Sequence, residues 1–364
     1  MGFDGHAARI VRQSLRRLIC ASHALGLAAL VSACGARQHA KPTSIPSAKP
    51  APALHQGPLS DFVPAASLRW LVLAKPPALF ADPELGSAIS QIISARRLDA
   101  FDEASGVDLR KLEHGAVAGF PYATLYLAEL PAGVAANARQ LFADRLLSGA
   151  TTKQVRPNLM RITGVVGQTP ETLLTADDRL LAVSVGDPLP AKIAEAYAEG
   201  RLKASPTALR GAALSTLPDL TADNPAVLLA PGPFADEWKR AASGLLESAV
   251  ALGVGIKPIG SGKIVATICV AGTWGQNPDS DIAARRLATA WSALTQSSAG
   301  HLFQLNPDAS VSATAELLTL HVELELEPLM RGLKAAVFSD VSELLQFSNR
   351  RETSPPNSAP NTTP

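Results

Sequence analysis

The sequence has few cysteines, few aromatic residues and almost no net charge. Its 364 residues include three cysteines and 5% aromatic residues, and the formal net charge is +1. Removal of residues 1–33 would take away four arginines and one aspartate, leaving 29 basic and 31 acidic residues. This balance provides no large basic field, so we expect no nucleic-acid partner. Only Cys34 and Cys269 would then remain, which excludes a disulfide framework and makes the fold depend on an apolar core.

Motifs for catalysis, metal binding and nucleotide binding are also absent from the sequence. It contains no Gly-x-Ser-x-Gly elbow, no His-Glu-x-x-His, no Ser-x-x-Lys nucleophile set and no calcium loop. The glycine-rich residues 253–263 do not form a phosphate loop, because Ile264 follows Lys263 where that motif requires a hydroxyl. We interpret them as a turn between a helix and a strand. We therefore expect no catalytic residue, no metal and no cofactor, although an enzyme with acids from distant positions stays an open alternative.

The N-terminal region has the layout of a secretory signal. Arginines at positions 9, 12, 16 and 17 precede a run over residues 18–33 that is too short and too rich in small residues for a membrane span. The run ends in Val31, Ser32 and Ala33, directly before Cys34. This order resembles the lipobox of bacterial lipoproteins. An ordinary signal peptide cleaved after Ala33 is the alternative.

The lipobox resemblance implies an attachment and a location. Signal peptidase would recognise Val31, Ser32 and Ala33, and Cys34 would become the first residue of the mature protein. Cys34 would carry a diacylglycerol thioether and a further acyl chain such as palmitate, which together give a stable membrane anchor. Because Gly35 follows Cys34 in place of aspartate, the resemblance implies the outer membrane of the cell envelope, facing the periplasm.

Proline-rich segments flank the body of the chain. Residues 34–66 contain six prolines among Ala, Ser, Lys and Gln, a composition typical of an extended tether. Residues 348–364 are rich in Pro, Ser, Thr and Asn, which is typical of a disordered tail. We expect the tether to hold the body away from the membrane.

Apolar patterns in the body predict two series of strands and helices. In residues 67–204 we expect strands at 69–74, 115–120, 122–130, 159–166 and 180–185, and helices at 83–103, 133–147 and after Pro190. Residues 205–224 are expected to be a connecting loop. In residues 225–347 we expect strands at 227–230, 264–271 and 318–326, and helices at 234–252, after a cap at Asp279, and at 328–347.

The two series begin alike. The segment from Val227 to a Phe-Ala-Asp at residues 234–236 resembles the segment from Val72 to a Phe-Ala-Asp at residues 80–82, and a proline turn separates the two parts in each. We therefore predict an α+β protein with two pseudo-repeated halves, each with helices packed on a mainly antiparallel sheet. This body resembles uncharacterised bacterial envelope lipoproteins with a duplicated α+β domain, a resemblance that carries no functional residue.

Three polar side chains share one face of the strand at 318–326. His321, Glu323 and Glu325 alternate with leucine and valine, so we expect a charged, solvated face opposite a buried one. A metal site there would need a further ligand, and His114 and His301 are far away in the sequence. Cys269 lies within an apolar strand and is predicted to be an inert core thiol.

Of the four tryptophans, Trp70, Trp238 and Trp291 fall on predicted strand or helix faces and are expected in the core. Trp274 falls in a predicted loop between Gly272 and Asn277, where an exposed aromatic side chain could contact a partner. It is the one surface-contact residue that the sequence suggests.

These observations favour a membrane-anchored, non-enzymatic envelope lipoprotein that binds a protein partner or has a structural role. The alternative is a carrier or sensor of an apolar ligand held between sheet and helices, motivated by the Ala, Leu and Val content and by a cleft expected between the halves. A deep apolar cavity would favour the carrier. A continuous core with one exposed apolar patch would favour the partner-binding protein.

Overall fold

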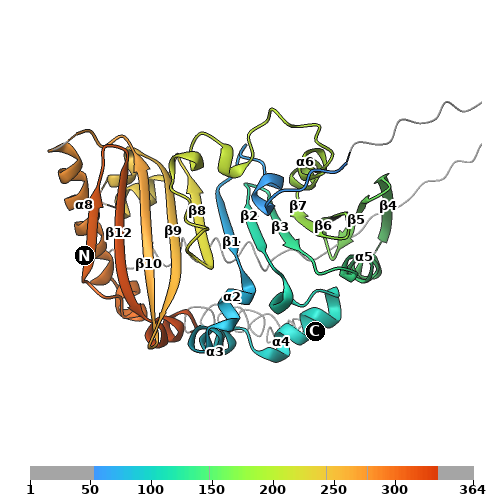
Figure 1. Cartoon of the computed structure of the whole chain (residues 1–364), viewed down its shortest axis with the longest axis horizontal. Helices are drawn as coiled ribbons and strands as arrows, with labels where there is room; N and C mark the ends of the chain where they lie inside the picture. The colour runs from blue at the N-terminus through green and yellow to red at the C-terminus, as the bar shows by residue number, and fades with distance from the viewer. Residues whose placement is uncertain (1–52, 147, 243, 277, 335–364) are drawn as a thin grey trace, which may run out of the picture.

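A single antiparallel sheet runs through the whole folded body. The computed structural model describes residues 53–334, apart from residues 147, 243 and 277. Within these ranges the chain forms a 12-stranded sheet in the order β11-β12-β10-β9-β8-β1-β2-β3-β7-β6-β5-β4 (Figure 1). All of its ladders are antiparallel, and helices pack on it, so the predicted α+β class is confirmed. The predicted signal peptide, lipobox and C-terminal tail lie outside the described residues.

The strands have the following bounds. They are β1 Trp70–Ala74, β2 Gly115–Gly119, β3 Ala123–Glu129, β4 Ser148–Arg156, β5 Leu159–Val166, β6 Thr169–Ala176, β7 Leu180–Gly186, β8 Ala226–Pro231, β9 Ala249–Gly260, β10 Lys263–Gly272, β11 Ala309–Ala313 and β12 Leu317–Glu325.

The helices connect and cover these strands. The α-helices are α2 Pro76–Ala81, α3 Pro83–Ile92, α4 Ala95–Ser105, α5 Val134–Arg145, α6 Leu189–Ala198, α7 Asp236–Ala241, α8 Asp279–Thr295 and α9 Ser298–Phe303. Residues 326–334 are also helical. Short 3-10 helices are η1 Leu59–Phe62, η2 Leu109–Lys111, η3 Ala208–Arg210, η4 Leu214–Thr216 and η5 Leu245–Glu247.

The ladder registers divide the side chains of the central strands between two faces. Leu73 lies opposite Val227, and Val72 lies opposite Leu228. Because successive side chains of a strand alternate, these two pairs point to opposite sides of the sheet. We call the side of Leu73 and Val227 the cleft face, and the side of Val72 and Leu228 the α8 face.

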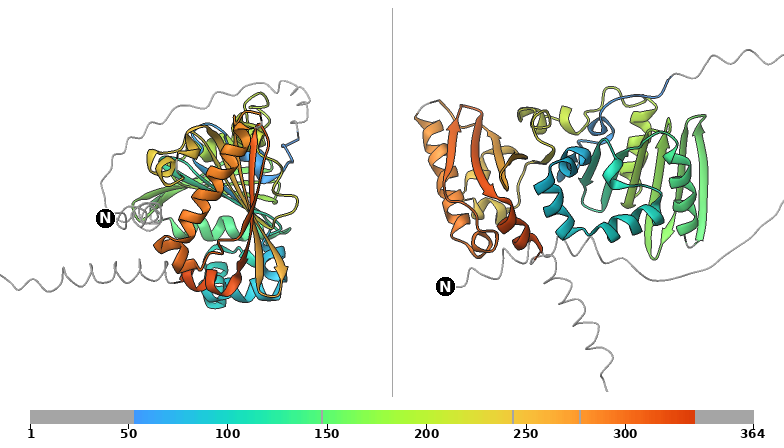
Figure 2. Two further views of the ribbon diagram at one scale, coloured as in Figure 1. Left: turned by 90° about the vertical axis from the view of Figure 1, so that its left-hand side faces the viewer. Right: turned by 60° about the horizontal axis from the view of Figure 1, so that its bottom comes forward.

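Different helices cover the two faces. On the α8 face, α8 packs on β10 and β12 at one end of the sheet, and α5 packs on β5 and β6 near the other end (Figures 1 and 2). On the cleft face, α6 and η1 pack on β3, β6 and β7. The helices α2 to α4 follow β1 and lie along one end of the strands (Figure 1). The sheet is strongly twisted, as Figure 2 shows.

Strong local patterns predict their elements well. In β12 the alternating residues Leu318, Leu320, Val322 and Leu324 are buried and His321, Glu323 and Glu325 are exposed, as predicted. Helix α5 buries Ala138 and Phe142, and α6 buries Ala194 and Tyr197, because these residues recur at helical spacing.

The predicted helix over residues 234–252 is wrong. Only Asp236–Ala241 is α-helical, η5 follows, and Ala249 already begins strand β9. Trp238, predicted to be in the core, is 51% exposed. The glycines at 253 and 255 lie within β9, and Gly260 and Gly262 form a β-hairpin turn between β9 and β10. The turn is thus limited to the end of the glycine-rich stretch and joins two strands, whereas the rest of the stretch is part of β9.

Other differences concern elements with weak local patterns. Strands β4, β6 and β11 and helices α2 and α9 were not expected, and Pro76 and Pro77 begin α2 where we expected a turn.

The N-cap of α8 is Pro278, and Asp279 is its first residue, so the predicted cap at Asp279 is wrong. Leu294 of that helix is 42% exposed, although its spacing from Leu287 and Trp291 would place it on the buried stripe. Of the helix expected at 328–347, residues 335–347 lie outside the described part.

The folded body begins before residue 67. Leu59, Phe62 and Val63 are buried in the core cluster on the cleft face, and the backbone nitrogen of His55 donates to the carbonyl oxygen of Ala198. Residues 55–66 are therefore part of the body, and the tether predicted to continue to residue 66 must end earlier.

Candidate functional site

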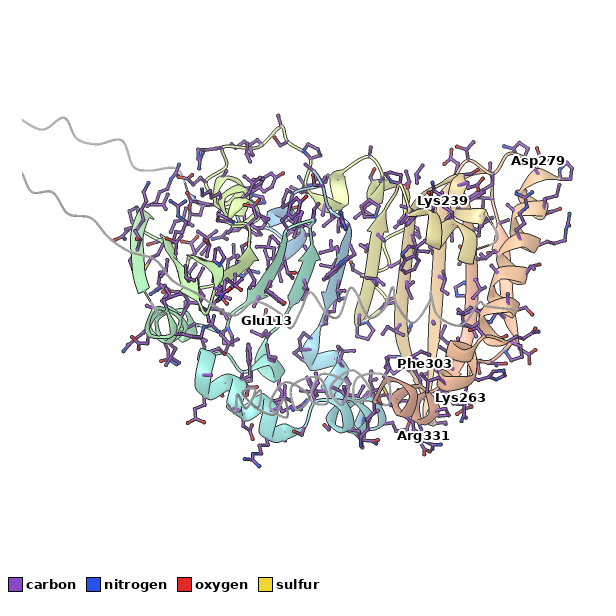
Figure 3. All side chains as sticks on the ribbon, turned by 180° about the vertical axis from the view of Figure 1, so that it is seen from behind. Glu113, Lys239, Lys263, Asp279, Phe303 and Arg331 are labelled. Atoms are coloured by element: carbon purple, nitrogen blue, oxygen red, sulfur yellow. The ribbon has the colours of Figure 1, made fainter. Side chains whose placement is uncertain are left out.

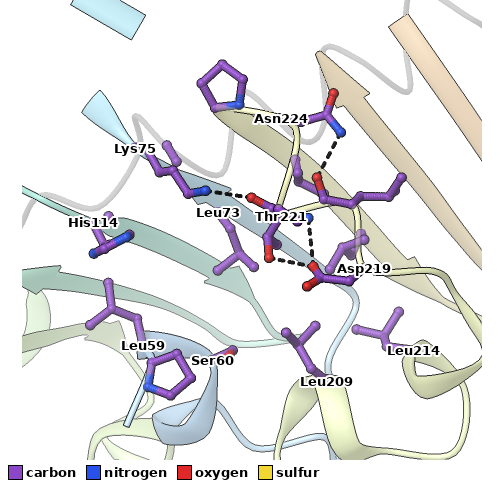
Figure 4. A pocket seen from close by; sticks show the side chains of 18 of the residues that line it. Leu59, Ser60, Leu73, Lys75, His114, Leu209, Leu214, Asp219, Thr221 and Asn224 are labelled. Carbon is purple, nitrogen blue, oxygen red and sulfur yellow. Dashed lines mark hydrogen bonds between the residues drawn. The ribbon is translucent and has the colours of Figure 1, made fainter. Parts of the chain in front are cut away.

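A cleft lies where the two parts of the sheet meet. It is on the cleft face, over β1 and β8, and has a volume of about 660 Å³ (Figure 4). Its walls come from η1, from the end of β1, from the start of β8, and from the segment between α6 and β8. Segments that are far apart in the sequence thus line one cavity, which is within the size range of small-molecule sites in proteins.

The floor and walls of the cleft are aliphatic. Leu73 of β1 and Val227 and Leu229 of β8 contribute the floor. The facing wall consists of leucines from η1, η3, η4 and the loop that follows, namely Leu59, Leu209, Leu214, Leu217 and Leu220. These leucines offer an apolar surface, and Asp219 of the same loop is the charged residue of this wall.

One polar group of the rim is centred on Thr221. The Lys75 ammonium donates a hydrogen bond to the carbonyl oxygen of Thr221 at 2.6 Å (Figure 4). The Asp219 carboxylate accepts from the Thr221 hydroxyl at 2.6 Å and from its backbone nitrogen at 2.9 Å. These bonds, with the nearby charge of Lys75, lower the pKa of Asp219. The buried Asn224 amide donates to the carbonyl oxygen of Leu220, so the loop at this rim is held by its own polar groups.

A second polar group lies at the start of β2 and the end of β3. His114 Nδ1 is 2.9 Å from Glu129 Oε2, and Arg179 Nε donates to Glu129 Oε1 at 2.6 Å. Burial by itself would raise the pKa of Glu129, but the hydrogen bonds from Arg179 and His114 lower it below its ordinary value. Glu113 approaches the same place, and one potential ligand atom from each of Glu113, His114 and Glu129 lies within 4.8 Å of the others. A metal ion would have to compete with Arg179 for Glu129.

The charges around the cleft are balanced. Lys75 faces Asp219, and Arg179 pairs with Glu129, so neither sign is in excess when His114 is neutral. In the part of the chain that the structure describes, His114 makes no hydrogen bond to a hydroxyl or thiol that could act as a nucleophile. The arrangement can enclose an apolar molecule and offer it hydrogen-bonding groups at the rim.

The surface contact predicted for Trp274 is wrong. Its side chain is only 8% exposed, and its indole nitrogen donates to the carbonyl oxygen of Val270 at 3.3 Å. It packs in the apolar cluster beneath α8 together with Trp291. The loop turns back on the sheet because the backbone nitrogens of Gly272 and Trp274 bond to the segment before β12.

The predicted burial of Cys269 and the predicted exposure of His321 are confirmed. Cys269 is 1% exposed, and burial raises the pKa of its thiol, as expected for a core residue. His321 is exposed and its Nδ1 is 3.0 Å from the hydroxyl of Thr267 on the neighbouring strand. Neither His114 nor His301 forms a metal-ligand group with it among the described residues.

Sequence reasoning missed the cleft residues because many of them lie in the segments expected to be a connecting loop or a tether. One signal was present in the expected connecting loop. Residues 209–220 carry four leucines, and leucines are costly to leave in water. A loop with this composition must cover or line an apolar surface.

Comparison of the chain with protein-family models, with curated proteins and with solved structures finds no match. Within residues 53–334, no helix has both the length and the apolar character needed to cross a membrane.

Proposed function

We propose that this protein is a lipid-anchored carrier or sensor that binds an apolar ligand in the cleft between its two parts. The observation that carries the proposal is the cavity of about 660 Å³ with aliphatic walls from β1, β8, η1, η3 and η4. A cavity of this kind suits an apolar molecule, because transfer of such a molecule from water is favourable in proportion to its apolar area.

The charged groups at the rim of the cleft indicate the charge of the ligand. The charge of Arg179 is neutralised by Glu129, and the charge of Lys75 is balanced by the nearby Asp219. The rim therefore has no excess charge that would attract a ligand of opposite charge. The ligand in this proposal is neutral or carries a small polar group, with its apolar part against Leu73 and Leu229.

A fluorescence titration with N-phenyl-1-naphthylamine tests this function. The protein is a secreted form that starts at Gly35, and the variant is Ser215→Trp, which places a large side chain at an exposed position on the cleft wall. We expect saturable binding by the unmodified protein and binding at least about tenfold weaker in the variant, because the indole occupies ligand volume.

Thr216→Trp is the matched control. Thr216 is the next residue of η4 and is also exposed, and its hydroxyl donates to a carbonyl three residues earlier, as that of Ser215 does. It does not line the cleft. Absence of saturable binding in the unmodified protein, or equal loss in both variants, would refute the carrier proposal.

A second candidate is a non-enzymatic envelope protein that binds a protein partner. It is favoured by the α8 face in the middle of the sheet, where Leu228 is 41% exposed although β8 is an interior strand. This candidate requires that the face be free in the mature protein.

We also propose that the two parts of the body are pseudo-repeats. When Val72 is aligned with Val227 in the sequence, residues 71–74 align with residues 226–229. The same two segments pair with each other in the β1–β8 ladder. An approximate two-fold axis normal to the sheet would relate β1 to β8. Because such an axis keeps each side chain on its own face, it would place Val72 on Leu228, one residue away from the aligned position. The helix α5 after β3 and the helix α8 after β10 would then correspond.

The proposed location follows from the N-terminal sequence. Cys34 would anchor the protein in the cell envelope, on the outer membrane facing the periplasm, and a proline-rich tether would hold the body away from the lipid. An apolar ligand exchanged with that membrane would then reach the cleft over a short distance.

A further inference from the structure

On the cleft face, a row of polar side chains adjoins a row of apolar ones. The apolar row crosses β8, β1, β2 and β3 through the ladder partners Val227, Leu73, Ala116 and Leu127. Two residues further along β1, β2 and β3, toward the end of the sheet that leads to α2, the next positions on this face are Lys75, His114 and Glu129. All three line the cleft. We call these three residues the polar row.

The backbone holds the polar row in register. The backbone nitrogen of Lys75 donates to the carbonyl oxygen of Pro225 at 2.8 Å, and that of Glu129 donates to the carbonyl oxygen of His114 at 2.9 Å. Lys75 directly follows the last paired residue of β1, and His114 directly precedes its partner on β2, so the two extend that ladder as neighbours. Figure 4 shows both side chains at the cavity. The sheet therefore fixes the positions of all three residues.

Glu129 decides which nitrogen of His114 carries the proton. Burial by itself raises the pKa of Glu129, but the hydrogen bonds from Arg179 and His114 lower it overall, so the carboxylate is ionised at neutral pH and only accepts hydrogen bonds. His114 Nδ1, 2.9 Å from Glu129 Oε2, must therefore carry a hydrogen. The neutral ring then presents a lone pair on Nε2, which makes no hydrogen bond within the described part of the chain. His114 thus offers the cleft an acceptor.

Lys75 offers a donor beside this acceptor. One hydrogen of its half-buried ammonium group bonds to the carbonyl oxygen of Thr221 at 2.6 Å, and among the described residues the other two have no acceptor. A neighbouring donor and acceptor match a hydroxyl group, which both accepts and donates. An ether, an ester or a carboxylate only accepts, and would leave His114 Nε2 without a partner.

The apolar floor beside the polar row suits an alkyl chain. Leu229 lies opposite Leu71, which is four residues before Lys75, so the floor extends about 13 Å from the polar row along the strands. The leucines of η1, η3 and η4 form the wall that faces this floor. A linear molecule can therefore place its chain between floor and wall and its head group at the polar row.

We propose that the ligand of the cleft is a neutral lipid alcohol whose hydroxyl group donates to His114 Nε2 and accepts from the Lys75 ammonium. This inference rests on the proposed carrier function and adds the class of ligand to it. Long-chain alcohols and monoacylglycerols have the required chemistry. Glu129 is a positioning residue, because it orients the His114 ring and fixes its proton on Nδ1.

Displacement of N-phenyl-1-naphthylamine by two matched compounds tests the proposal. The compounds are 1-decanol and decyl methyl ether, which differ because the ether oxygen cannot donate a hydrogen bond. The protein is the secreted form that starts at Gly35, at about pH 8 with EDTA, where a free imidazole is neutral. We expect the alcohol to displace the dye at a concentration at least about tenfold lower than the ether, because the ether leaves His114 Nε2 unpaired.

Substitutions in the polar row separate the two hydrogen bonds. His114→Phe should reduce the preference for the alcohol to less than about twofold while dye binding is retained, because it removes the acceptor. Lys75→Met should weaken the alcohol and the ether alike, because both oxygens accept from Lys75. The control is His301→Phe, at an exposed histidine of α9 that does not line the cleft, and it should keep the full preference.

The outcomes distinguish this proposal from the carrier function. Equal displacement by alcohol and ether, with saturable dye binding, would overturn the lipid alcohol and leave the carrier standing, whereas absence of saturable dye binding would overturn both. Tighter binding of decanoate than of 1-decanol would also overturn the proposal, since the polar row would then recognise a carboxylate.

A metal ion is the remaining alternative at the polar row. Glu113 precedes β2 at this end of the sheet (Figure 3), and one potential ligand atom from each of Glu113, His114 and Glu129 lies within 4.8 Å of the others. A preference for the alcohol that is absent with EDTA and appears only with added zinc would overturn the direct hydrogen bond to His114 in favour of a metal at these three residues.

Discussion

Asp108 is the charged residue with the most strongly lowered pKa in the described part of the protein. Its carboxylate accepts hydrogen bonds from the side chain and backbone nitrogen of Arg110, and Lys111 lies 3.2 Å away. These interactions, first of all the side-chain bond with Arg110, lower the pKa of Asp108 from 3.8 to about 2. The Asp108 carboxylate caps the N-terminus of η2, the 3-10 helix that precedes β2.

We therefore predict that Asp108→Asn destabilises the protein by about 1 kcal/mol at pH 7, after allowance for the solvent around Arg110. The folded pKa is lower than the unfolded one, so this stability is present above about pH 4 and is lost as the pH falls toward about 2. Urea unfolding as a function of pH measures it.

Asp99→Asn is the control for this change, because Asp99 pairs with the same guanidinium at 2.9 Å but is 62% exposed. We expect it to cost less than about 0.5 kcal/mol. Equal effects of the two substitutions, or a difference that persists at pH 2, would contradict the role assigned to Asp108.

At the scale of elements, α8 illustrates how one helix face supports the sheet. Ala283, Leu287 and Trp291 are buried against β10 and β12, and the Trp291 indole donates to the carbonyl oxygen of Asn306 at 3.0 Å. Leu294 lies on the same helix but is 42% exposed. The stability that α8 contributes therefore comes from its buried stripe.

Leu287→Ala should lower the free energy of unfolding by about 2–4 kcal/mol, because it removes buried methyl groups and leaves a cavity. Leu294→Ala should change the free energy of unfolding by less than about 0.5 kcal/mol. Denaturant melts of the two variants measure both values. If the two leucine substitutions cost the same, the burial assigned to the helix is incorrect.

At the scale of the whole molecule, the β1–β8 ladder joins the N-terminal and C-terminal parts into one sheet. Leu71 and Leu229 pair in this ladder and are both buried in the core of the cleft face. The cleft exists only because the two parts meet there. The proposed ligand binding therefore requires both parts of the chain, and neither part alone would form the cleft.

The proposed membrane anchor is tested on the whole protein in its host. Cys34→Ala should abolish incorporation of a palmitate analogue and release the protein from the membrane fraction or leave it unprocessed, because the acyl chains attach at Cys34. Cys269→Ala, at the buried thiol, should leave both labelling and fractionation unchanged. Full labelling and normal processing of the Cys34→Ala protein would refute the lipoprotein assignment.

The sequence by itself determined the elements whose patterns are local. The alternation of leucines with His321, Glu323 and Glu325 defines β12, and the helical spacing of Ala138 and Phe142 defines α5. Cys269 was placed in the core for the same reason, since its neighbours along the strand are apolar. These patterns are readable because each residue's face depends only on its position along one strand or helix.

Only the tertiary structure decided the features that depend on contacts between distant segments. Residues 249–252 fit a helix by spacing, but they become strand β9 because β8 and β10 supply backbone partners on both sides. Trp274 is buried because its loop bonds to the segment before β12, and the leucines of residues 209–220 line a cleft because β8 returns beside β1. Strand pairing and burial are set by which segments meet in space, and spacing along the chain does not contain that information.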